Sequence, residues 1–445
     1  MKFKRNNIFS ILSLLAIACV AFSCTHDDIN FDINFGISGG TSGTTEAVRS
    51  EGECYKNVFL LYSAGYNNLS VDFDEDVTDL LSNYIPSSRR EAILIFSHRT
   101  KSDGDYTTKT SPVLLRALCD AEGKVTCDTL LVMEPGAPSV SKEALNDVLT
   151  YVKNRFPSEH YGLMFSSHSS GWLPPKYKFS NPWNIARHGE NTETAGIDPH
   201  GPRQDGLPAV RSIGSEWAKP EGDREMDIKD FADAIPMHLD YIIFDTCLMG
   251  GVEVAYELRN KCNEIVFSPA EILAEGMDYT TLISYLINDP GRDLTGFAQN
   301  YYNFYNDPHR SFSYRSGTIT LIDCTRIEQL AHTCKDIFSA HREDISRLHT
   351  KTNSVQMYYT MSSHKCFYDL EDIVSHCNAS TEEFSALRSA LDACIPYCAA
   401  TDYILGSIKV NTYSGLSMYL PLPSEPGLNS YYMTLEWNKA TGLVE

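Results

Sequence analysis

The sequence predicts an α/β protein whose mostly parallel sheet carries helices on both faces. Short apolar runs alternate with helical patterns along the chain, which is typical of strand and crossover-helix units. Most of these runs lack any alternation of polar and apolar residues, as expected for strands covered on both sides. The strand-like runs are residues 57–64, 91–97, 128–134, 161–167, 241–246, 264–269, 318–323 and 415–421.

The segments between the strands carry helix signals. Residues 140–156 form a helical pattern in which Ser141 is the expected N-cap and Glu143 follows in the first turn. The acidic run 71–79 lacks the glycine and terminal glutamate spacing of an EF-hand, so we interpret it as the start of a solvated helix. Residues 324–400 are chiefly helical, and no linker separates them from the preceding strands. We therefore expect one domain over residues 54–445, without an internal repeat.

The N-terminus resembles an export signal. Basic residues precede an apolar run over residues 8–22, which is too short to span a membrane, and Ser23 then precedes Cys24. Cys24 is placed as in a bacterial lipoprotein box, and the acidic segment after it is similar to signals that send lipoproteins to the cell surface. We expect a signal peptide over 1–23, a lipid on Cys24 and a Gly/Ser-rich tether over 24–53. A simple signal peptide with a chance cysteine is the alternative.

Charge and cysteine content limit the partners. The formal net charge of -21 and the pI near 5.0 argue against nucleic acid and anionic membrane surfaces, and they are compatible with a basic ligand. Disulfides are permitted outside the cytoplasm, but thirteen cysteines do not define a connectivity. Spacings such as Cys394 to Cys398 form no convincing zinc site, and we predict no metal cluster.

Two predicted strands end in reactive side chains. Ligands of open α/β sheets bind beyond the carboxyl ends of the strands. His168 follows the strand 161–167, and Cys247 follows the strand 241–246. If these strands are neighbours, a general base and a thiol emerge side by side. We expect Cys247 to open the next helix, where unpaired N–H groups and the helix dipole favour a thiolate. A thiolate and an imidazole together are the minimal apparatus for nucleophilic acyl transfer.

The segments "SHSSGW" and "DTCLMGGVEVAYEL" resemble the two signature segments of the clostripain family of cysteine peptidases, which is related to gingipains, legumains and caspases. Weaker similarity extends the resemblance over roughly residues 57–440. The resemblance implies a caspase-like three-layer sandwich. It also implies a cysteine endopeptidase that forms an acyl-enzyme with its substrate.

The same resemblance implies roles for individual residues. His168 would be the general base and later the acid, and Cys247 would be the nucleophile. The oxyanion would be held by the backbone N–H groups of Cys247 and Ser169. Asp245 would line the S1 pocket, which receives the substrate residue before the cleaved bond (P1), and would select Arg or Lys there.

Two positions depart from the family pattern, and each assignment has an alternative. Ser169 stands where the family usually has Gly, and its side chain would restrict the oxyanion pocket; Thr246 replaces the usual Ala. His168 could instead be a strand-end histidine satisfied by the backbone. Cys247 could be a small core residue, and Asp245 a structural brace of the helix N-terminus.

A long insertion over residues 173–224 separates the two signature segments and is dense in Pro, Gly, Asn and charged residues. Stretches of this kind are usually functional or disordered. In the family, cleavage after a basic residue in this interval can mature the enzyme; an inert surface loop is the alternative. Some members use calcium, although nothing in this sequence requires a cofactor. The basic candidates are Arg187, Arg203, Arg211, Lys219 and Arg224.

The sequence thus predicts a lipid-anchored, extracytoplasmic cysteine endopeptidase that cleaves proteins or peptides after Arg or Lys. The anchor would attach it to the outer membrane, and the acidic segment after Cys24 points to the cell surface of a Gram-negative bacterium. The alternative is a surface lipoprotein of the same fold that binds a peptide or glycan without turnover. The presence of both His168 and Cys247 favours the enzyme over the binding protein, because binding alone has no need of both residues.

Overall fold

The computed structural model describes residues 54–88, 90–177, 213–217, 223–287, 291–351, 354–359 and 366–445. The signal peptide, Cys24 and the tether lie outside these residues, and so do four of the basic candidates in the insertion. Residues 54–445 form one compact unit.

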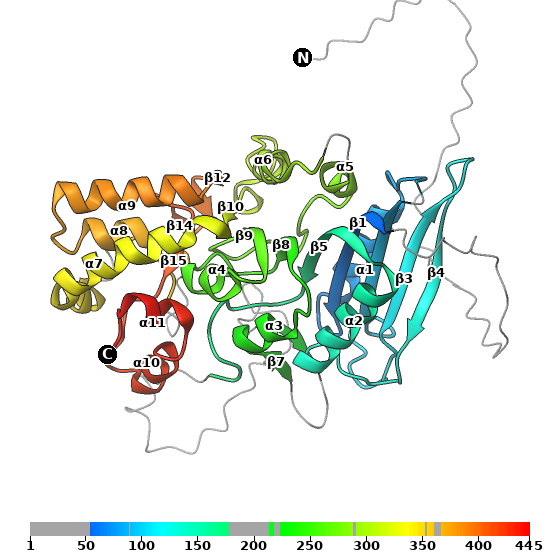
Figure 1. The fold of residues 1–445 in the computed structure, drawn as a ribbon, viewed down its shortest axis with the longest axis horizontal. Coiled ribbons are helices and arrows are strands. Elements are labelled where there is room, and N and C mark those ends of the chain that lie inside the picture. Colours follow the sequence, from blue (N-terminus) through cyan, green and yellow to red (C-terminus); the bar gives the residue numbers. More distant parts are fainter. Residues whose placement is uncertain are drawn as a thin grey trace, which may run out of the picture. The chain divides into compact units, whose positions relative to one another are not determined.

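A nine-stranded sheet forms the centre of the described chain (Figure 1). Its strand order is β12-β10-β9-β8-β5-β1-β2-β3-β4, and the five strands from β9 to β2 are mutually parallel. Only β3 and β10 run against the others, so the predicted mostly parallel sheet is confirmed. The strands are β1 (Tyr55–Gly65), β2 (Glu91–Arg99), β3 (Val113–Cys119), β4 (Val125–Val132), β5 (Ser158–Ser166), β8 (Leu239–Asp245), β9 (Cys262–Phe267), β10 (Thr318–Asp323) and β12 (Tyr397–Ala400).

Helices cover both faces of this sheet, so the chain has the predicted three layers. Apolar residues of β1 alternate between two cores, with Leu60 facing one and Leu61 the other. The Leu61 core is covered by α1 (Ser70–Leu81), α5 (Leu282–Leu286) and α6 (Leu294–Tyr305). The Leu60 core is covered by α2 (Lys142–Arg155), α3 (Ile228–Ala234), α4 (Val252–Leu258), α7 (Ile327–Arg347), α8 (Leu370–Ser375), α9 (Thr381–Cys394), α10 (Pro426–Tyr432) and α11 (Glu436–Thr441).

Local signals explain the helix that precedes β5. Ser141 is the N-cap of α2, and its hydroxyl accepts a hydrogen bond from the backbone N–H of Ala144, as predicted. Glu143 lies in the first turn, and basic residues lie in the last turn, which suits the helix dipole. Leu145 and Leu149 are buried against the sheet. The helix thereby returns the chain to the edge where β5 begins.

Two sequence predictions about strands were incomplete. The run 415–421 yields only β15 (Ser417–Met418), which pairs with β11 (Tyr368–Asp369) outside the central sheet. The strand β3 was missed, because Arg116 interrupts its apolar pattern; the guanidinium lies over the rings of Tyr55 and Phe156. In the described chain, no helix is long and apolar enough to cross a membrane.

Candidate active site

The two strands that deliver His168 and Cys247 are neighbours, as the sequence interpretation required. β5 and β8 pair in parallel, and Ser166 is aligned with Asp245. His168 and Cys247 each follow two residues beyond this aligned pair. Both therefore leave the sheet at its carboxyl-terminal edge, on adjacent strands.

Cys247 lies in a turn, so the prediction that it opens a helix is wrong. The helix α4 begins only at Val252, with Gly251 as its N-cap. Leu248 has φ of 62°, a left-handed conformation that interrupts any right-handed helix at this point. The Cys247 sulfur, half-buried, lies 3.4 Å from the backbone nitrogen of Ile272, which donates to it. The thiol also donates to the carbonyl oxygen of Ile272 at 3.7 Å, so the backbone of Ile272, and not the start of α4, contacts the sulfur.

His168 is buried and is oriented by a residue that sequence reasoning missed. Its Nε2 lies 2.8 Å from the side-chain oxygen of Asn68. An amide oxygen can only accept, so in the neutral ring the proton is on Nε2 and the lone pair is on Nδ1. Asn68 follows the end of β1, the strand beside β5. Its position three residues beyond the carboxyl end of a strand was the signal that the sequence offered.

Glycines let the two signature segments meet. Gly171 has φ of 63°, and a Cβ there would lie 2.5 Å from the carbonyl oxygen of Leu248. A Cβ on Gly250 would lie 2.3 Å from the backbone nitrogen of Pro269. Trp172 is fully buried against Tyr419 and packs the segment onto the C-terminal part of the chain. These glycines are therefore required by close packing at the site.

Ser169 does not crowd the site in the way its replacement of Gly led us to expect. Its hydroxyl donates to the sulfur of Met249 at 2.9 Å and accepts from the backbone N–H of Gly171 at 3.1 Å. The side chain therefore ties the His168 segment to the Cys247 segment. Within the described residues, the backbone N–H of Ser169 donates no hydrogen bond, so it is available to an oxyanion.

Asp245 is buried two residues before Cys247. Its Oδ2 accepts hydrogen bonds from Tyr279 at 2.7 Å and from Ser166 at 3.3 Å. Burial raises the pKa of this carboxyl, and the hydrogen bonds from Tyr279, Met277 and Ser166 oppose that rise. Gly276, with φ of 62°, packs against the carboxylate so closely that a Cβ would lie 2.6 Å from Oδ2. In the described part of the chain, Asp245 has no cationic partner.

Part of the predicted insertion is ordered and braces the site. The strand β6 (Ile213–Glu216) pairs with β7 (Arg224–Met226), so the interval 173–224 is not structureless throughout. The backbone N–H of Gly214 donates to the carbonyl of His168 at 2.9 Å. The backbone N–H of Ser215 donates to Ser167 at 3.1 Å, and its carbonyl accepts from Asn67 at 2.8 Å. The strand β6 thus contacts both the His168 segment and the residue before Asn68.

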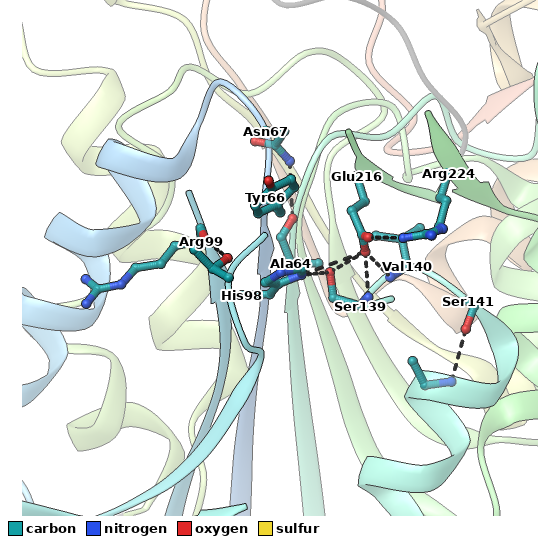
Figure 2. Close-up of polar contacts among 12 residues, drawn as sticks. Ala64, Tyr66, Asn67, His98, Arg99, Ser139, Val140, Ser141, Glu216 and Arg224 are labelled. Atoms are coloured by element: carbon teal, nitrogen blue, oxygen red, sulfur yellow. Dashed lines mark hydrogen bonds and ion pairs between the residues drawn. The ribbon is translucent and has the colours of Figure 1, made fainter. Parts of the chain in front are cut away.

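Glu216 fixes β6 to the loop before α2 (Figure 2). Its buried Oε2 accepts from the Ser139 backbone N–H at 2.5 Å, from the Ser139 hydroxyl at 2.8 Å and from the Val140 N–H at 3.1 Å. Arg224 pairs with the other carboxylate oxygen. Nδ1 of His98 lies 2.8 Å from the Ser139 hydroxyl; because that hydroxyl donates its proton to Glu216, Nδ1 is assigned as the donor. This network, which we call the Glu216 cluster, secures β6 and through it the catalytic segments.

The remaining cysteines and the acidic residues form no further centre in the described chain. All eleven cysteines in the described residues are free thiols. The same residues contain no group of three or more His, Cys, Asp or Glu side chains arranged to hold a metal ion.

Comparisons with known proteins identify the family of the chain. The model of the clostripain family matches residues 200–436, which is more than half of the chain and includes Cys247. The chain belongs to the clostripain family. It is therefore a cysteine peptidase, and peptides or proteins are its substrates. A search of curated proteins gave no match.

Solved structures of the clostripain family, also called C11 proteases, share the fold. An inactive zymogen C11 protease from Parabacteroides distasonis is 26% identical with a TM-score of 0.67, covering 87% of this chain and 99% of that one. A secreted C11 cysteine protease from Bacteroides thetaiotaomicron, in complex with an irreversible peptide inhibitor, is 22% identical with a TM-score of 0.68 and the same coverage. The predicted caspase-like fold is thus confirmed.

Proposed function

We propose that the protein is an endopeptidase that cleaves after Arg or Lys with a Cys247/His168 dyad. The observation that carries this proposal is the alignment of β5 with β8, which brings both residues to one edge of the sheet. Nδ1 of His168 takes the thiol proton, and the Cys247 thiolate attacks the scissile carbonyl. The imidazolium then protonates the leaving amine, and water hydrolyses the acyl-enzyme.

The backbone N–H groups of Ser169 and Cys247 stabilise the oxyanion in this mechanism. Removal of one such donor costs about 2.7 to 4 kcal/mol of transition-state stabilisation in known enzymes. The tie between Ser169 and Met249 supports this role, because it fixes the backbone that carries the N–H relative to the Cys247 turn.

Basic specificity rests on Asp245. Asp245 lies two residues before Cys247, and both side chains contact the segment after β9, Asp245 through Tyr279 and Cys247 through the backbone of Ile272. A P1 side chain would therefore lie near the carboxylate once its carbonyl meets the sulfur. A buried carboxylate without a cationic partner in the described chain favours a guanidinium or ammonium group. Arg would be preferred to Lys if the contact is bidentate.

The location proposed is extracytoplasmic, with a lipid on Cys24 that anchors the protein to the outer membrane. The basic start, the apolar run and the cysteine after Ser23 support it. Incorporation of radiolabelled palmitate, lost in Cys24→Ala, tests the anchor. Equal membrane association of the variant would contradict it.

Processing in the insertion is the form of maturation that membership of the family implies for this chain. Arg224 is an unsuitable site because it pairs with Glu216 within a hairpin. The proposal therefore places cleavage after one of the other basic residues, which N-terminal sequencing of the mature fragments would reveal. Calcium dependence stays a family expectation, tested by assay with and without a chelator. The other basic residues are Arg187, Arg203, Arg211 and Lys219.

Peptide substrates with a fluorogenic leaving group test the activity and its specificity. We expect turnover with Arg or Lys at P1 and little with Asn or Asp. Cys247→Ala should lose activity, whereas Cys119→Ala should keep it, because Cys119 lies at the end of β3, away from the paired ends of β5 and β8. Turnover by Cys247→Ala, or a preference for Asn or Asp, would contradict the proposal.

A further inference from the structure

Asp245 belongs to a row of polar side chains that crosses three strands at the carboxyl-terminal edge of the sheet. Ser63 of β1 is aligned with Ser166 of β5, and Ser166 is aligned with Asp245 of β8. Aligned residues of parallel strands point to the same face, so the three side chains share one face. That face is the one covered by α1, because the residues two positions earlier belong to its core, namely Leu61, Met164 and Ile243.

The helix α1 directs an acidic residue toward this face. α1 packs beside β1 (Figure 1), and its buried residues include Phe73, Asp76 and Leu80, which recur at helical spacing. Asp76 is only 8% exposed. Its Oδ2 is buried and has no hydrogen-bond partner among the described residues. A carboxyl group in the middle of an apolar helix face is costly unless a partner is supplied.

Among the described residues, the charged groups that shift the pKa of Asp76 are all acidic. Burial is the main cause that raises the pKa of Asp76, to about 10, and Asp245 of β8 is the next, followed by carboxylates of α1 itself. Tyr279 faces both Asp76 and Asp245 and donates its hydroxyl proton to Asp245. Because Asp245 accepts hydrogen bonds and the Asp76 Oδ2 accepts none, Asp245 carries the negative charge and Asp76 holds a proton. The contributing carboxylates of α1 are Asp72, Asp79 and Glu75, whereas Asp74 of the same helix pairs with Arg99 at 2.9 Å.

We propose that Asp76 is a second acidic residue of the S1 pocket and that the basic P1 side chain of the substrate is the missing cation between Asp76 and Asp245. This inference rests on the proposed cleavage after Arg or Lys. A guanidinium presents donors on several sides of one plane and can bridge two carboxylates. When it binds, the proton of Asp76 leaves to solvent, so each basic side chain bound releases one proton near neutral pH.

Matched variants on one helix test the assignment. The reference substrate carries Arg at P1, and the control substrate carries citrulline, a neutral group of the same shape. We expect Asp76→Asn to lower kcat/KM for the Arg substrate about tenfold or more and to leave the citrulline substrate unchanged. Asp79→Asn makes the same substitution at an exposed position of α1 and should change neither rate appreciably. The melting temperature of Asp76→Asn should stay close to that of the wild type, because a neutral amide replaces a neutral acid.

Asp245→Asn separates this inference from the proposed function. Suppose that Asp245→Asn selectively lowers kcat/KM for the Arg substrate while Asp76→Asn behaves like Asp79→Asn. The role of Asp76 is then overturned, and the proposed specificity for basic P1 residues stands. If the wild type does not prefer Arg over citrulline at P1, both the role of Asp76 and the proposed basic specificity fail.

A measurement on the unmodified protein guards against a variant that does not fold. Calorimetric titration with benzamidine, in two buffers of different ionisation enthalpy, counts the protons released on binding. We expect about one proton per benzamidine bound near pH 7, as a carboxyl with a pKa well above its ordinary value must ionise. Binding without proton release, or no binding, would overturn the proposal.

Discussion

At the scale of single residues, the site consists of side chains held by contacts from outside the two signature segments. Asn68 orients the His168 ring, the Ile272 backbone N–H contacts the Cys247 sulfur, and Tyr279 donates to Asp245. These partners come from the segment after β1, from the segment after β9 and from the loop before α5. The catalytic geometry therefore depends on residues far away in the sequence.

Asn68 should be a positioning residue whose loss lowers kcat more than it changes KM. Asn68→Ala removes the acceptor that fixes the His168 tautomer, and we expect kcat to fall roughly 10- to 100-fold, as small misplacements of catalytic groups do. Asn68→Asp keeps an acceptor and adds a negative charge beside the imidazole. It should restore part of the rate and move the acidic limb of the pH profile upward.

The matched control is Asn83→Ala, because Asn83 is exposed on the protein surface and bonds only to the backbone of Asp79. If Asn68→Ala and Asn83→Ala have the same kinetics, His168 does not depend on Asn68.

The sequence could predict that His168 and Cys247 follow neighbouring strands, but not which residues contact them. The two apolar strand patterns and the two signature segments were enough to propose this pair. The partners Asn68 and Ile272 could not be named, since they reach the site through the order of strands in the sheet and the path of a loop. The helix expected at Cys247 failed for a local reason, the left-handed turn at Leu248 and the close packing at Gly250.

At the scale of elements, β6 connects the insertion to the catalytic edge. It donates to the carbonyl of His168 and accepts from Asn67, while the Glu216 cluster holds it to the start of α2 (Figure 2). Sequence reasoning treated this strand as part of a structureless insertion, because four residues between glycines and prolines carry no periodic signal. Most of the larger strands and α2 were predictable from apolar runs and a helix cap.

Loss of the Glu216 charge should weaken both stability and activity. Glu216→Gln keeps the shape but removes charge-assisted hydrogen bonds to Ser139 and Val140 and leaves Arg224 without its partner. We expect the free energy of unfolding to fall by about 2 to 4 kcal/mol. Thermal and chemical denaturation measure this change, and kcat should fall in the protein that remains folded.

Glu122→Gln provides the control, because Glu122 is exposed in the turn between β3 and β4. Equal stability of the two variants would show that the Glu216 cluster does not secure β6.

At the scale of the whole molecule, buried titratable groups make the fold sensitive to acid. Burial lowers the pKa of His98 to about 4, and neighbouring Glu216 only partly opposes this effect. The ring is therefore neutral in the folded protein, whereas in the unfolded chain it takes up a proton below its ordinary pKa of about 6.5. Stability is then full above pH 6.5 and declines as the pH falls from 6.5 to 4.

This single group should account for about 3 kcal/mol of acid destabilisation over that interval. Denaturation at several pH values should show a shallower decline for His98→Asn than for the wild type, whatever the variant's stability at pH 7. His309→Asn, at an exposed histidine, should keep the wild-type slope. Parallel slopes for the wild type and His98→Asn would rule out His98 as the acid-sensitive group.

The central claim is that Cys247 is the nucleophile of a peptidase whose acidic S1 pocket binds a basic P1 side chain. Reaction with a peptidyl chloromethyl ketone that carries Arg at P1, in which the Cys247 sulfur displaces chloride to form a stable thioether, tests both parts at once when it is followed by mass spectrometry of the proteolytic fragments. We predict one adduct per protein, on Cys247, lost in His168→Ala and much slower with an inhibitor that carries Asp at P1. An adduct on another cysteine, or equal labelling by the Arg and Asp inhibitors, would contradict this account.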